Sequence, residues 1–380
     1  MATDNKNKVL NVPHLRFPEF SGEWNKYTIN DLATVVGGGT PDTTVKSYWG
    51  GDIQWFTPSE IGKNKYVDFS KRTITRDGLD NSSAKLLPLH TILLSSRATV
   101  GECSIASNEC TTNQGFQSLI AKQCNIDFLY YLIQTKKKDL IRNACGSTFL
   151  EISANEIRKI KVAVPVQNEQ EQIAKLLSLI DERIATQNKI IEDLKILKSA
   201  IAERLFNSTD GDILSLSDVC IIQKGKQVNG EDLSETGKFY VMNGGVEPSG
   251  YYDQCNTPAN TISISEGGNS CGYIQYNRDA FWSGGHCYTL NNIQPNVCKL
   301  YLYHYLKSQE SSIMKLRIGT GLPNIQKKDL EKFHILLTSK AIQESISAFL
   351  TTIDRKITNE DMLLQRFQKG KQYLLRQMFI

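Results

Sequence analysis

Residues 173–206 read IAKLLSLIDERIATQNKIIEDLKILKSAIAERLF, and this stretch decides the fold. Apolar residues recur along it in steps of three, four or seven, and the slot at Gln187 is polar. This spacing is typical of a heptad seam and predicts a helix of about 40 residues, roughly 60 Å long. One apolar stripe has no opposing surface within its own helix, so the helix requires a partner.

The helical unit occurs twice. Residues 146–206 read again as residues 319–379 without a gap, at a constant offset of 173 positions (319 − 146). The simplest arrangement packs the two helices on each other as an antiparallel coiled coil. A core helix of an ordinary globular domain is the alternative, which this length disfavours. The predicted seam consists of Ile173, Leu177, Ile180, Ile184, Ile191 and Leu194 in the first helix, and Ile346, Leu350, Ile353, Ile357, Leu364 and Phe367 in the second.

A polar residue interrupts each seam at the same place, Gln187 in the first copy and Glu360 in the second. Two interpretations are open. A buried polar seam residue can set helix register. Alternatively, both side chains are simply exposed to solvent.

A globular block precedes each helix. The blocks begin alike, at an offset of 187 (Ile29-Asn30-Asp31-Leu32 and Leu216-Ser217-Asp218-Val219), and end alike at an offset of 173. The difference, 187 − 173 = 14 residues, is lost inside the second block, so similar frames carry different interiors. Short apolar runs between glycine, asparagine and serine clusters predict β-rich interiors, and the tyrosine- and leucine-rich ends predict short amphipathic helices. Residues 157–165 and 330–337 are predicted as β-like runs that lead into the long helices.

The expected fold class is therefore α+β (mixed α/β), with two β-rich domains, each followed by a long helix, related by an internal pseudo-two-fold repeat. We expect an N-terminal segment (1–26), block one (27–145), a first lead-in strand and long helix (146–206), a linker (207–214), block two (215–318) and a second lead-in strand and long helix (319–380).

Composition indicates a cytoplasmic protein without membrane association. The 380 residues have a mean hydropathy of −0.33 and contain no run long enough to span a membrane. The first eight residues lack the apolar core of a signal peptide. Nine scattered cysteines, an odd number without Cys-x-x-Cys, favour free buried thiols over disulfides or zinc. The net charge of +4 (44 − 40) permits a nucleic-acid partner without requiring one.

Catalytic motifs are absent from the sequence. There is no phosphate-binding Gly-x-x-x-x-Gly-Lys-Ser/Thr loop, no His-Glu-x-x-His array and no Asn/Asp-Pro-Pro-Tyr/Phe tetrapeptide. Glu60 and Lys63 faintly resemble a nuclease site after Pro41-Asp42, but their spacing does not place both on one face of a strand. The stretch Ser95-Ser96-Arg97 could be read as a nucleophile region, yet no partner is evident and a recognition loop or buried turn is favoured. We predict no catalytic residue and no metal site.

Basic residues cluster in both blocks, among aromatic ones. Such clusters are either solvated loops or DNA contacts. The candidates for DNA contact are Lys63, Lys65, Tyr66, Lys71, Arg72 and Arg76 in block one, and Lys224, Lys226, Tyr273 and Arg278 in block two.

Five strings together carry a family resemblance: PHLRFP (13–18) followed by Gly22-Glu23-Trp24, GGGTP (37–41), SSRATVG (95–101), NQGF (113–116) and PVQNEQEQI (165–173). With the repeat architecture, they resemble the specificity subunit of a type I restriction-modification enzyme over essentially the whole chain. The second copy departs from the pattern, with Thr338 in place of the proline and Ile342 in place of Glu169. Block two also lacks the GGTP and NQGF strings, and 224–226 (KGK) and 284–286 (GGH) stand near those places.

The resemblance implies that each block is a target-recognition domain reading one half of an asymmetric, bipartite site in double-stranded DNA. The helices would fix the gap and dock two methyltransferase subunits, which methylate adenine at N6 with S-adenosylmethionine. Restriction subunits would add ATP- and Mg²⁺-dependent translocation and cleavage, so this chain itself would hold no cofactor. Further candidates for DNA contact are Arg97, Thr99 and Gln114 in block one, and Gln227, Asn243 and Asn269 in block two.

Two rival functions belong to other classes. A coiled-coil adaptor that never touches DNA explains the helices, but not the matched frames with divergent interiors. A self-contained enzyme requires a catalytic constellation that the sequence does not contain.

Overall fold

The computed structural model describes residues 11–146, 150–319, 321 and 323–380. The chain forms two compact units. Unit 1 comprises residues 1–188 and 363–380, and unit 2 comprises residues 189–362. Each contains sheets and helices, which confirms the α+β class.

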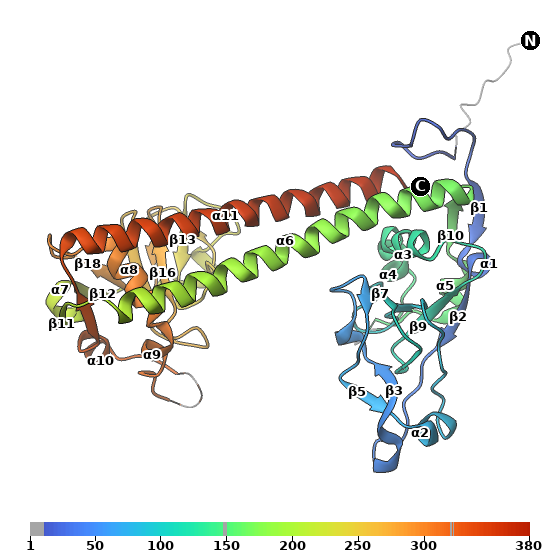
Figure 1. Cartoon of the computed structure of the whole chain (residues 1–380), viewed down its shortest axis with the longest axis horizontal. Helices are drawn as coiled ribbons and strands as arrows, with labels where there is room; N and C mark the ends of the chain where they lie inside the picture. Colours follow the sequence, from blue (N-terminus) through green and yellow to red (C-terminus); the bar gives the residue numbers. More distant parts are fainter. Residues whose placement is uncertain (1–10, 147–149, 320, 322) are drawn as a thin grey trace, which may run out of the picture. The chain divides into compact units, whose positions relative to one another are not determined.

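Block one, in unit 1, is built on two sheets (Figure 1). The five-stranded sheet has the order β2-β9-β6-β7-β4, and the three-stranded sheet has the order β5-β3-β8. Their strands are β2 (Ala33–Gly37), β3 (Trp49–Phe56), β4 (Tyr66–Val67), β5 (Arg72–Ile74), β6 (Ile92–Leu94), β7 (Cys103–Ala106), β8 (Cys110–Thr112) and β9 (Gln117–Ala121). Leu93 and Leu94 are fully buried, as expected for the centre of a sheet that is covered on both faces.

Short helices complete this block. They are α1 (Ile29–Leu32), η1 (Lys46–Tyr48), η2 (Pro58–Glu60), α2 (Arg76–Asp80), α3 (Ile126–Thr135), α4 (Lys137–Arg142) and α5 (Ala154–Lys159). The amphipathic helix predicted at the end of the block is α3, whose first turn is capped by the side chain of Asn125. A separate antiparallel pair joins β1 (Asn25–Thr28) to β10 (Lys161–Val164), directly before the long helix α6 (Gln167–Asn207).

Block two, in unit 2, repeats this plan with shorter sheets. The order of one sheet is β12-β18-β15-β16 and that of the other is β14-β13-β17, while β11 pairs with β19 as β1 does with β10. The strands are β11 (Asp212–Ser215), β12 (Ile221–Lys224), β13 (Phe239–Met242), β14 (Tyr251–Tyr252), β15 (Thr261–Ser265), β16 (Ile274–Asn277), β17 (Trp282–Ser283), β18 (Cys287–Asn291) and β19 (His334–Leu337). The helices are α7 (Leu216–Val219), η3 (Gly230–Asp232), α8 (Lys299–Ser308), α9 (Glu310–Met314), α10 (Lys327–Glu331) and α11 (Lys340–Gln377).

The common start of the two blocks is a common capping motif. Thr28 and Asp31 form a capping box at α1, and Ser215 and Asp218 form the same box at α7. The residues that match at the 187-residue offset therefore form the same N-terminal helix cap in both blocks.

Two predictions require correction. Only the second half of each predicted lead-in run is a strand, because the first half belongs to α5 or α10. Ser153 caps α5 by accepting a hydrogen bond from the Glu156 amide, and helix-forming residues follow it. All nine cysteines lie in the described part of the chain and are free thiols, but Cys145 and Cys255 are exposed rather than buried.

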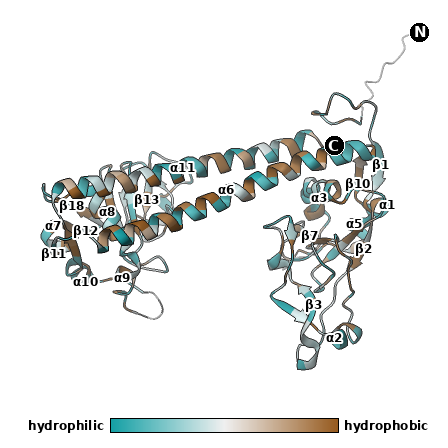
Figure 2. Ribbon diagram, in the orientation of Figure 1, coloured by the Kyte–Doolittle hydropathy of each residue, from teal (hydrophilic) through white to brown (hydrophobic). Residues whose placement is uncertain are grey.

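The long helices pack against each other within each unit, and in both units they run antiparallel. In unit 1, Ile173 and Leu177 of α6 share a core with Met378 and Phe379, which directly follow α11, and Leu374 of α11 packs against it. In unit 2, Phe206 shares a core with α11 residues Ile346 and Leu350. All twelve predicted seam residues are buried or half-buried, and hydrophobic and hydrophilic residues alternate along both helices (Figure 2).

Neither polar slot is open to solvent. Gln187 is 5% exposed, and the Glu360 side chain is 12% exposed and pairs with Lys356. Simple solvent exposure is therefore wrong as an account of these residues, and a role in setting register stays a prediction.

None of the helices in the described residues is long and apolar enough to cross a lipid bilayer.

Candidate nucleic-acid interface

Three loops come together in each block, and we call them the loop cluster. In block one they are residues 37–41, 95–101 and 113–116; in block two they are residues 224–227, 265–272 and 284–287. The Gly38 amide donates to Phe116 O (3.4 Å) as the Gly225 amide donates to Cys287 O (2.8 Å). The residues at 224–226 and 284–286 thus occupy the places of the strings that block two lacks.

The middle loop of each cluster is held on both sides by matching bonds. In block one, the Ser96 amide donates to Gly115 O (2.8 Å), and Ser96 O accepts from the Ile152 amide (2.9 Å). In block two, Glu266 makes the same two bonds, to His286 O (2.9 Å) and from the Ile325 amide (2.8 Å). Both loops then turn through a positive φ, 63° at Ala98 and 77° at Gly268. The backbone framework is therefore the same in both blocks.

Glycine is required where the first and third loops approach each other. A Cβ atom at Gly38 would lie 2.0 Å from Asn113 O, and one at Gly225 would lie 2.3 Å from Gly284 O. Neither backbone oxygen can move away without breaking the loop, so a larger residue is excluded at both positions.

The side chains on this framework differ between the blocks. Block one places Arg97 where block two has Gly267, and Thr99 where block two has Asn269. The same backbone therefore presents a guanidinium and a hydroxyl in one block, and an amide in the other. These are functional groups with different base preferences.

In block one, the loop cluster carries polar side chains, and some of them bond to each other or to neighbouring side chains. The Arg97 guanidinium bonds Glu151 (2.7 Å), and both side chains remain more than two-fifths exposed. Gln114 accepts a hydrogen bond from Thr40, and Thr99 is exposed. Ser95 lies in a buried turn, where its hydroxyl bonds Arg97 O and the Thr99 hydroxyl, as expected for a turn rather than a nucleophile.

In block two, a buried carboxylate organises the loop cluster. Glu266 is 8% exposed and lies 2.5 Å from Lys224 Nζ and 3.3 Å from His286 Nδ1. The Tyr288 hydroxyl donates to the same carboxylate, and burial together with this negative charge raises the pKa of Tyr288.

The other candidates of block two lie around this centre or outside it. Asn243 accepts from the His286 amide (3.0 Å), the Gln227 side chain donates to Val228 O, and Lys226 and Asn269 are exposed. Tyr273 lies outside the cluster beneath Lys307, whose Nζ is 3.9 Å from the ring centre. Arg278 is exposed, immediately after β16.

Most of the basic candidates in block one are exposed. Lys63, Lys71, Arg72 and Arg76 are all exposed, and Arg76 pairs with Asp80 one turn along α2. The Arg72 guanidinium lies 3.5 Å from the centre of the Trp49 ring, so a cation–π contact fixes its direction.

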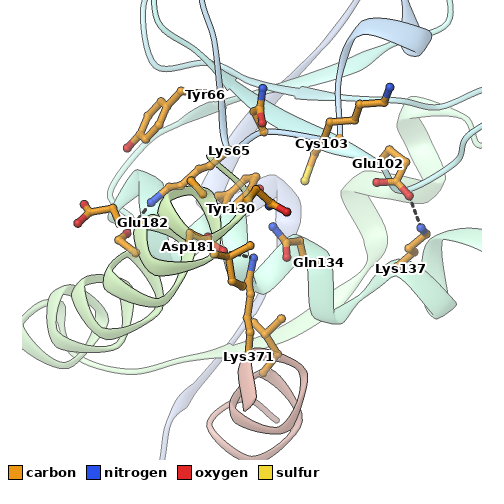
Figure 3. Close-up of a pocket in the computed structure, with 18 of the residues that line it drawn as sticks. Lys65, Tyr66, Glu102, Cys103, Tyr130, Gln134, Lys137, Asp181, Glu182 and Lys371 are labelled. Atoms are coloured by element: carbon orange, nitrogen blue, oxygen red, sulfur yellow. Dashed lines mark hydrogen bonds and ion pairs between the residues drawn. The ribbon is translucent and has the colours of Figure 1, made fainter. Parts of the chain in front are cut away.

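Lys65 and Tyr66 instead line a pocket of about 600 Å³ where block one meets α6 and the end of α11 (Figure 3). The Lys65 ammonium bonds Asp127 (2.7 Å) and Ser178 (2.6 Å), and its side chain is only 9% exposed. The Tyr66 hydroxyl donates to Asp127, and burial with this hydrogen bond raises the pKa of Tyr66. Lys65 is therefore engaged inside unit 1.

Beside the same pocket lies a repeated cluster that the sequence analysis did not single out. Tyr131 donates to Asp181 (2.7 Å), and Asp181 also pairs with Lys371 (2.6 Å). In unit 2 the positions 173 residues away along the repeat are His304, Asp354 and Lys198, and Lys198 pairs with Asp354 (2.5 Å). Each cluster fastens a block to both long helices. Comparing the two copies at the 173-residue offset would have found it.

The sequence analysis also assigned no contact to Gln170 and Gln343, which occupy matching positions in the two copies. The Gln170 amide donates to Pro165 O (2.9 Å), and its oxygen accepts from the Asn125 amide (3.0 Å). Gln343 does the same with Thr338 O and the Cys298 amide. The turn into the second helix is therefore preserved although Thr338 replaces the proline.

The described residues show no catalytic arrangement of side chains. Among the described residues, no group of three or more His, Cys, Asp and Glu side chains could hold a metal ion. A duplicated frame with two different sets of exposed polar groups defines a recognition protein.

Comparisons with known proteins agree with this class. The family model for the type I restriction modification DNA specificity domain matches residues 21–195 and again residues 210–366. The chain therefore belongs to the type I restriction-modification DNA specificity family and carries two copies of its domain. It is a specificity subunit, a non-catalytic component of such a complex, and the resemblance inferred from the sequence is confirmed.

Relatives and solved structures support the same assignment. The type I restriction enzyme MjaIX specificity subunit of Methanocaldococcus jannaschii is 27% identical over 399 residues, covering 93% of this chain and 92% of the relative. A putative type I specificity subunit of Mycoplasma genitalium is 35% identical over 160 residues, 42% of each chain. The crystal structure of a type I S subunit from M. genitalium covers 97% of this chain and 99% of its own, with a TM-score of 0.63 at 21% identity, and shares the fold.

Proposed function

We propose that block one (27–145) and block two (215–318) each read one half of a bipartite site in double-stranded DNA, and that the two halves differ in sequence. The observation that carries this proposal is the loop cluster, one backbone framework with different side chains in each block. Arg97 and Gln114 suit guanine and adenine in the major groove, while Asn269 and Gln227 offer amides in block two. Exposed lysine and arginine side chains would bind phosphates and set the register.

The long helices would pair along their length as an antiparallel coiled coil and fix the gap between the half-sites. The packing of α6 on α11 seen in each unit supports this, because both contacts have the same direction. The pairing places two pseudo-symmetric domains against a duplex whose strands are themselves related by two-fold axes.

Two methyltransferase subunits would dock along the helices, and restriction subunits would join the full complex in the cytoplasm. Large apolar side chains remain exposed on both helices, which is typical of an interaction surface. They are Leu179, Ile190, Ile196 and Leu197 on α6, and Ile342, Phe349, Met362, Leu363 and Tyr373 on α11. S-adenosylmethionine, ATP and Mg²⁺ would be held by these partners.

Mapping of N6-methyladenine across the genome tests the proposal, in cells with the intact system and in cells lacking this chain. We expect deletion to erase one split, asymmetric motif with a fixed gap. Loss of a continuous palindrome, or unchanged methylation in cells shown to contain the assembled complex, would contradict it. The Ile190→Glu, Leu363→Glu double variant should lose co-purification with methyltransferase subunits, whereas Glu182→Gln on the same helix should keep it.

A further inference from the structure

Phe69 is the most exposed of the large hydrophobic residues in the described chain. It is 81% exposed, and Ile213 follows at 70%. Single exposed apolar residues are common on protein surfaces, so exposure alone carries no conclusion. Three further features distinguish Phe69: a rigid loop, a concentrated positive charge and a length that only block one has.

The loop holds Phe69 in one position. Ser70, the next residue, accepts through its hydroxyl from the Trp55 amide (2.9 Å), and its own amide donates to Gln54 Oε1 (2.7 Å). The Lys71 amide donates to Glu60 Oε1 (2.6 Å), and Asp68 O accepts from Asn108 (3.3 Å). Both neighbours of Phe69 are thus tied to the body of the block, while the ring itself points away from it. A loop whose backbone is held in this way loses little further entropy on binding.

The charge around this loop is concentrated. Residues 63–76 contain Lys63, Lys65, Lys71, Arg72 and Arg76 against Asp68 alone, a net charge of +4 (5 − 1). Two of these cations are paired with carboxylates outside the segment, Lys65 with Asp127 and Arg76 with Asp80, so the charge offered to a ligand comes from Lys63, Lys71 and Arg72. Lys71 and Arg72 lie two and three positions from the ring and are exposed, and the Trp49 ring directs Arg72. A projecting aromatic ring with cations beside it matches a polyanion with stacked aromatic groups, which is duplex DNA.

The segment is specific to block one. Gln54 pairs with Thr73, as Tyr240 pairs with Tyr251 in block two. Thr57 follows Gln54 by three positions, as Asn243 follows Tyr240. The segment from Thr57 to Thr73 therefore spans 16 positions (73 − 57) in block one, whereas the corresponding segment from Asn243 to Tyr251 spans only 8 (251 − 243) in block two. The first part of the segment in block one lies beside α6, where Lys65 bonds Ser178 (2.6 Å), and its last part leads into β5 of the three-stranded sheet, at the end of block one remote from α6 (Figure 1). The segment is therefore an addition that starts beside α6 and ends at that remote sheet, and Phe69 lies in its second half, between β4 and β5.

We propose that Phe69 is a wedge that enters the base stack of the half-site read by block one, while Lys71 and Arg72 bind the phosphates on either side. This inference rests on the proposed function, because it requires block one to bind duplex DNA. Apolar side chains that enter a base step unstack it and bend the duplex, which makes the sequence at that step part of the recognition.

The test uses the assembled complex with its methyltransferase subunits and a duplex carrying the mapped site. 2-Aminopurine is placed in turn at positions of both half-sites other than the methylated adenine. The wild-type complex should raise its fluorescence at one step, in one half-site only. Phe69→Ala should abolish that signal and weaken binding about tenfold, with an unchanged slope of log affinity against log salt. Phe69→Trp should retain both properties.

Two controls separate the wedge from other effects. Ile213→Ala removes a similarly exposed side chain flanked by Asp212 and should change neither signal. Lys71→Ala should lower the salt slope by about one while leaving the unstacking signal in place.

The failures are distinguishable. If Phe69→Ala binds the site and unstacks it as the wild type does, the wedge is wrong while DNA recognition stands. If the wild-type complex binds the mapped site no better than a scrambled duplex, the proposed function fails as well. If Phe69→Ala loses methyltransferase subunits instead, Phe69 is a protein contact and the inference is overturned.

Discussion

Buried polar side chains do much of the positioning in this protein at the scale of single residues. Gln343 is 1% exposed, and its amide group bonds the Cys298 amide, Asn296 O and Thr338 O. The side chain ties the start of α8 to the turn before α11. Removing it would leave these backbone groups without partners inside the protein.

Gln343→Ala should therefore lower the free energy of unfolding of unit 2 by about 2–4 kcal/mol, since each unsatisfied buried group costs about 1–3 kcal/mol. Urea unfolding monitored by hydrogen exchange in α8 and α11 measures this loss. Asn359→Ala, which removes an exposed amide from the same helix within unit 2, is the matched control and should change stability by less than about 0.5 kcal/mol. Equal effects of the two changes would show that the buried bonds contribute nothing.

His304 predicts a pH dependence. It is 3% exposed, and burial and the nearby Lys198 lower its pKa from 6.5 to about 4, although Asp354 opposes this shift. The unfolded state therefore binds a proton on this histidine at a higher pH than the folded state. Stability should fall as pH drops from about 6.5 to about 4 and should lose nothing further from this group below that range.

His304→Tyr, which copies Tyr131 at the matching position of unit 1, should reduce that loss. Thermal melting of unit 2 between pH 7 and pH 4 measures it. The exposed His334→Tyr serves as a control and should keep the wild-type pH profile. An unchanged slope in His304→Tyr would mean that other groups cause the acid sensitivity.

At the scale of elements, the end of α11 completes the core of unit 1. The Phe379 ring stacks with Phe128 and meets Trp24 edge to face, and the Leu15 amide donates to Gln377 O. At the end of α6, Phe206 packs edge to face on Tyr301 and Tyr305 in unit 2. A core element of each block is thus supplied by the far end of a helix that starts after the other block.

Phe379→Ala should lower the stability of unit 1 by about 3–5 kcal/mol, because it empties a buried aromatic site. Amide hydrogen exchange should accelerate in α3 and β1 and should remain unchanged in α8. Tyr373→Ala, which is 60% exposed on the same helix, controls for the loss of an aromatic ring. Faster exchange in both units would contradict this local effect.

Much of the structure at the scale of elements was predictable from the sequence. The seam residues, the short helices α3 and α8 and the common starts of the blocks follow from spacing alone, because periodicity and capping are local properties. The helices α5 and α10 were missed, since an apolar run of a few residues suits a strand or a buried helix equally well. The contact of Phe379 with Trp24 joins residues 355 positions apart (379 − 24), and no local pattern encodes it.

At the scale of the whole molecule, the proposed coiled coil acts as a ruler. Duplicating residues 190–196 and 363–369 adds one heptad to each helix and keeps both seams in phase. Seven residues lengthen a helix by roughly 10 Å, or about three base pairs. The gap in the methylated motif should grow by about that amount, with both half-sites unchanged.

Sequencing of N6-methyladenine in cells carrying the lengthened chain measures the gap. A heptad in α6 alone leaves the seams unmatched and should abolish methylation without creating a new gap. If the double insertion left the gap unchanged, the long helices would have no role in setting the distance between the half-sites.

The sequence by itself determined the duplication, the two long helices, the β-rich blocks and the family, because repeats, periodicities and strings of residues are written along one dimension. The tertiary structure alone decided which side chains face outward. It placed Lys65 in the pocket beside α6 rather than on an open surface, and it gave the loops at Arg97 and Gly267 the same backbone, although their sequences share little beyond Ser95 and Ser265. Hydrogen bonds between backbone groups hold these loops, and such bonds depend on position in space rather than on residue type.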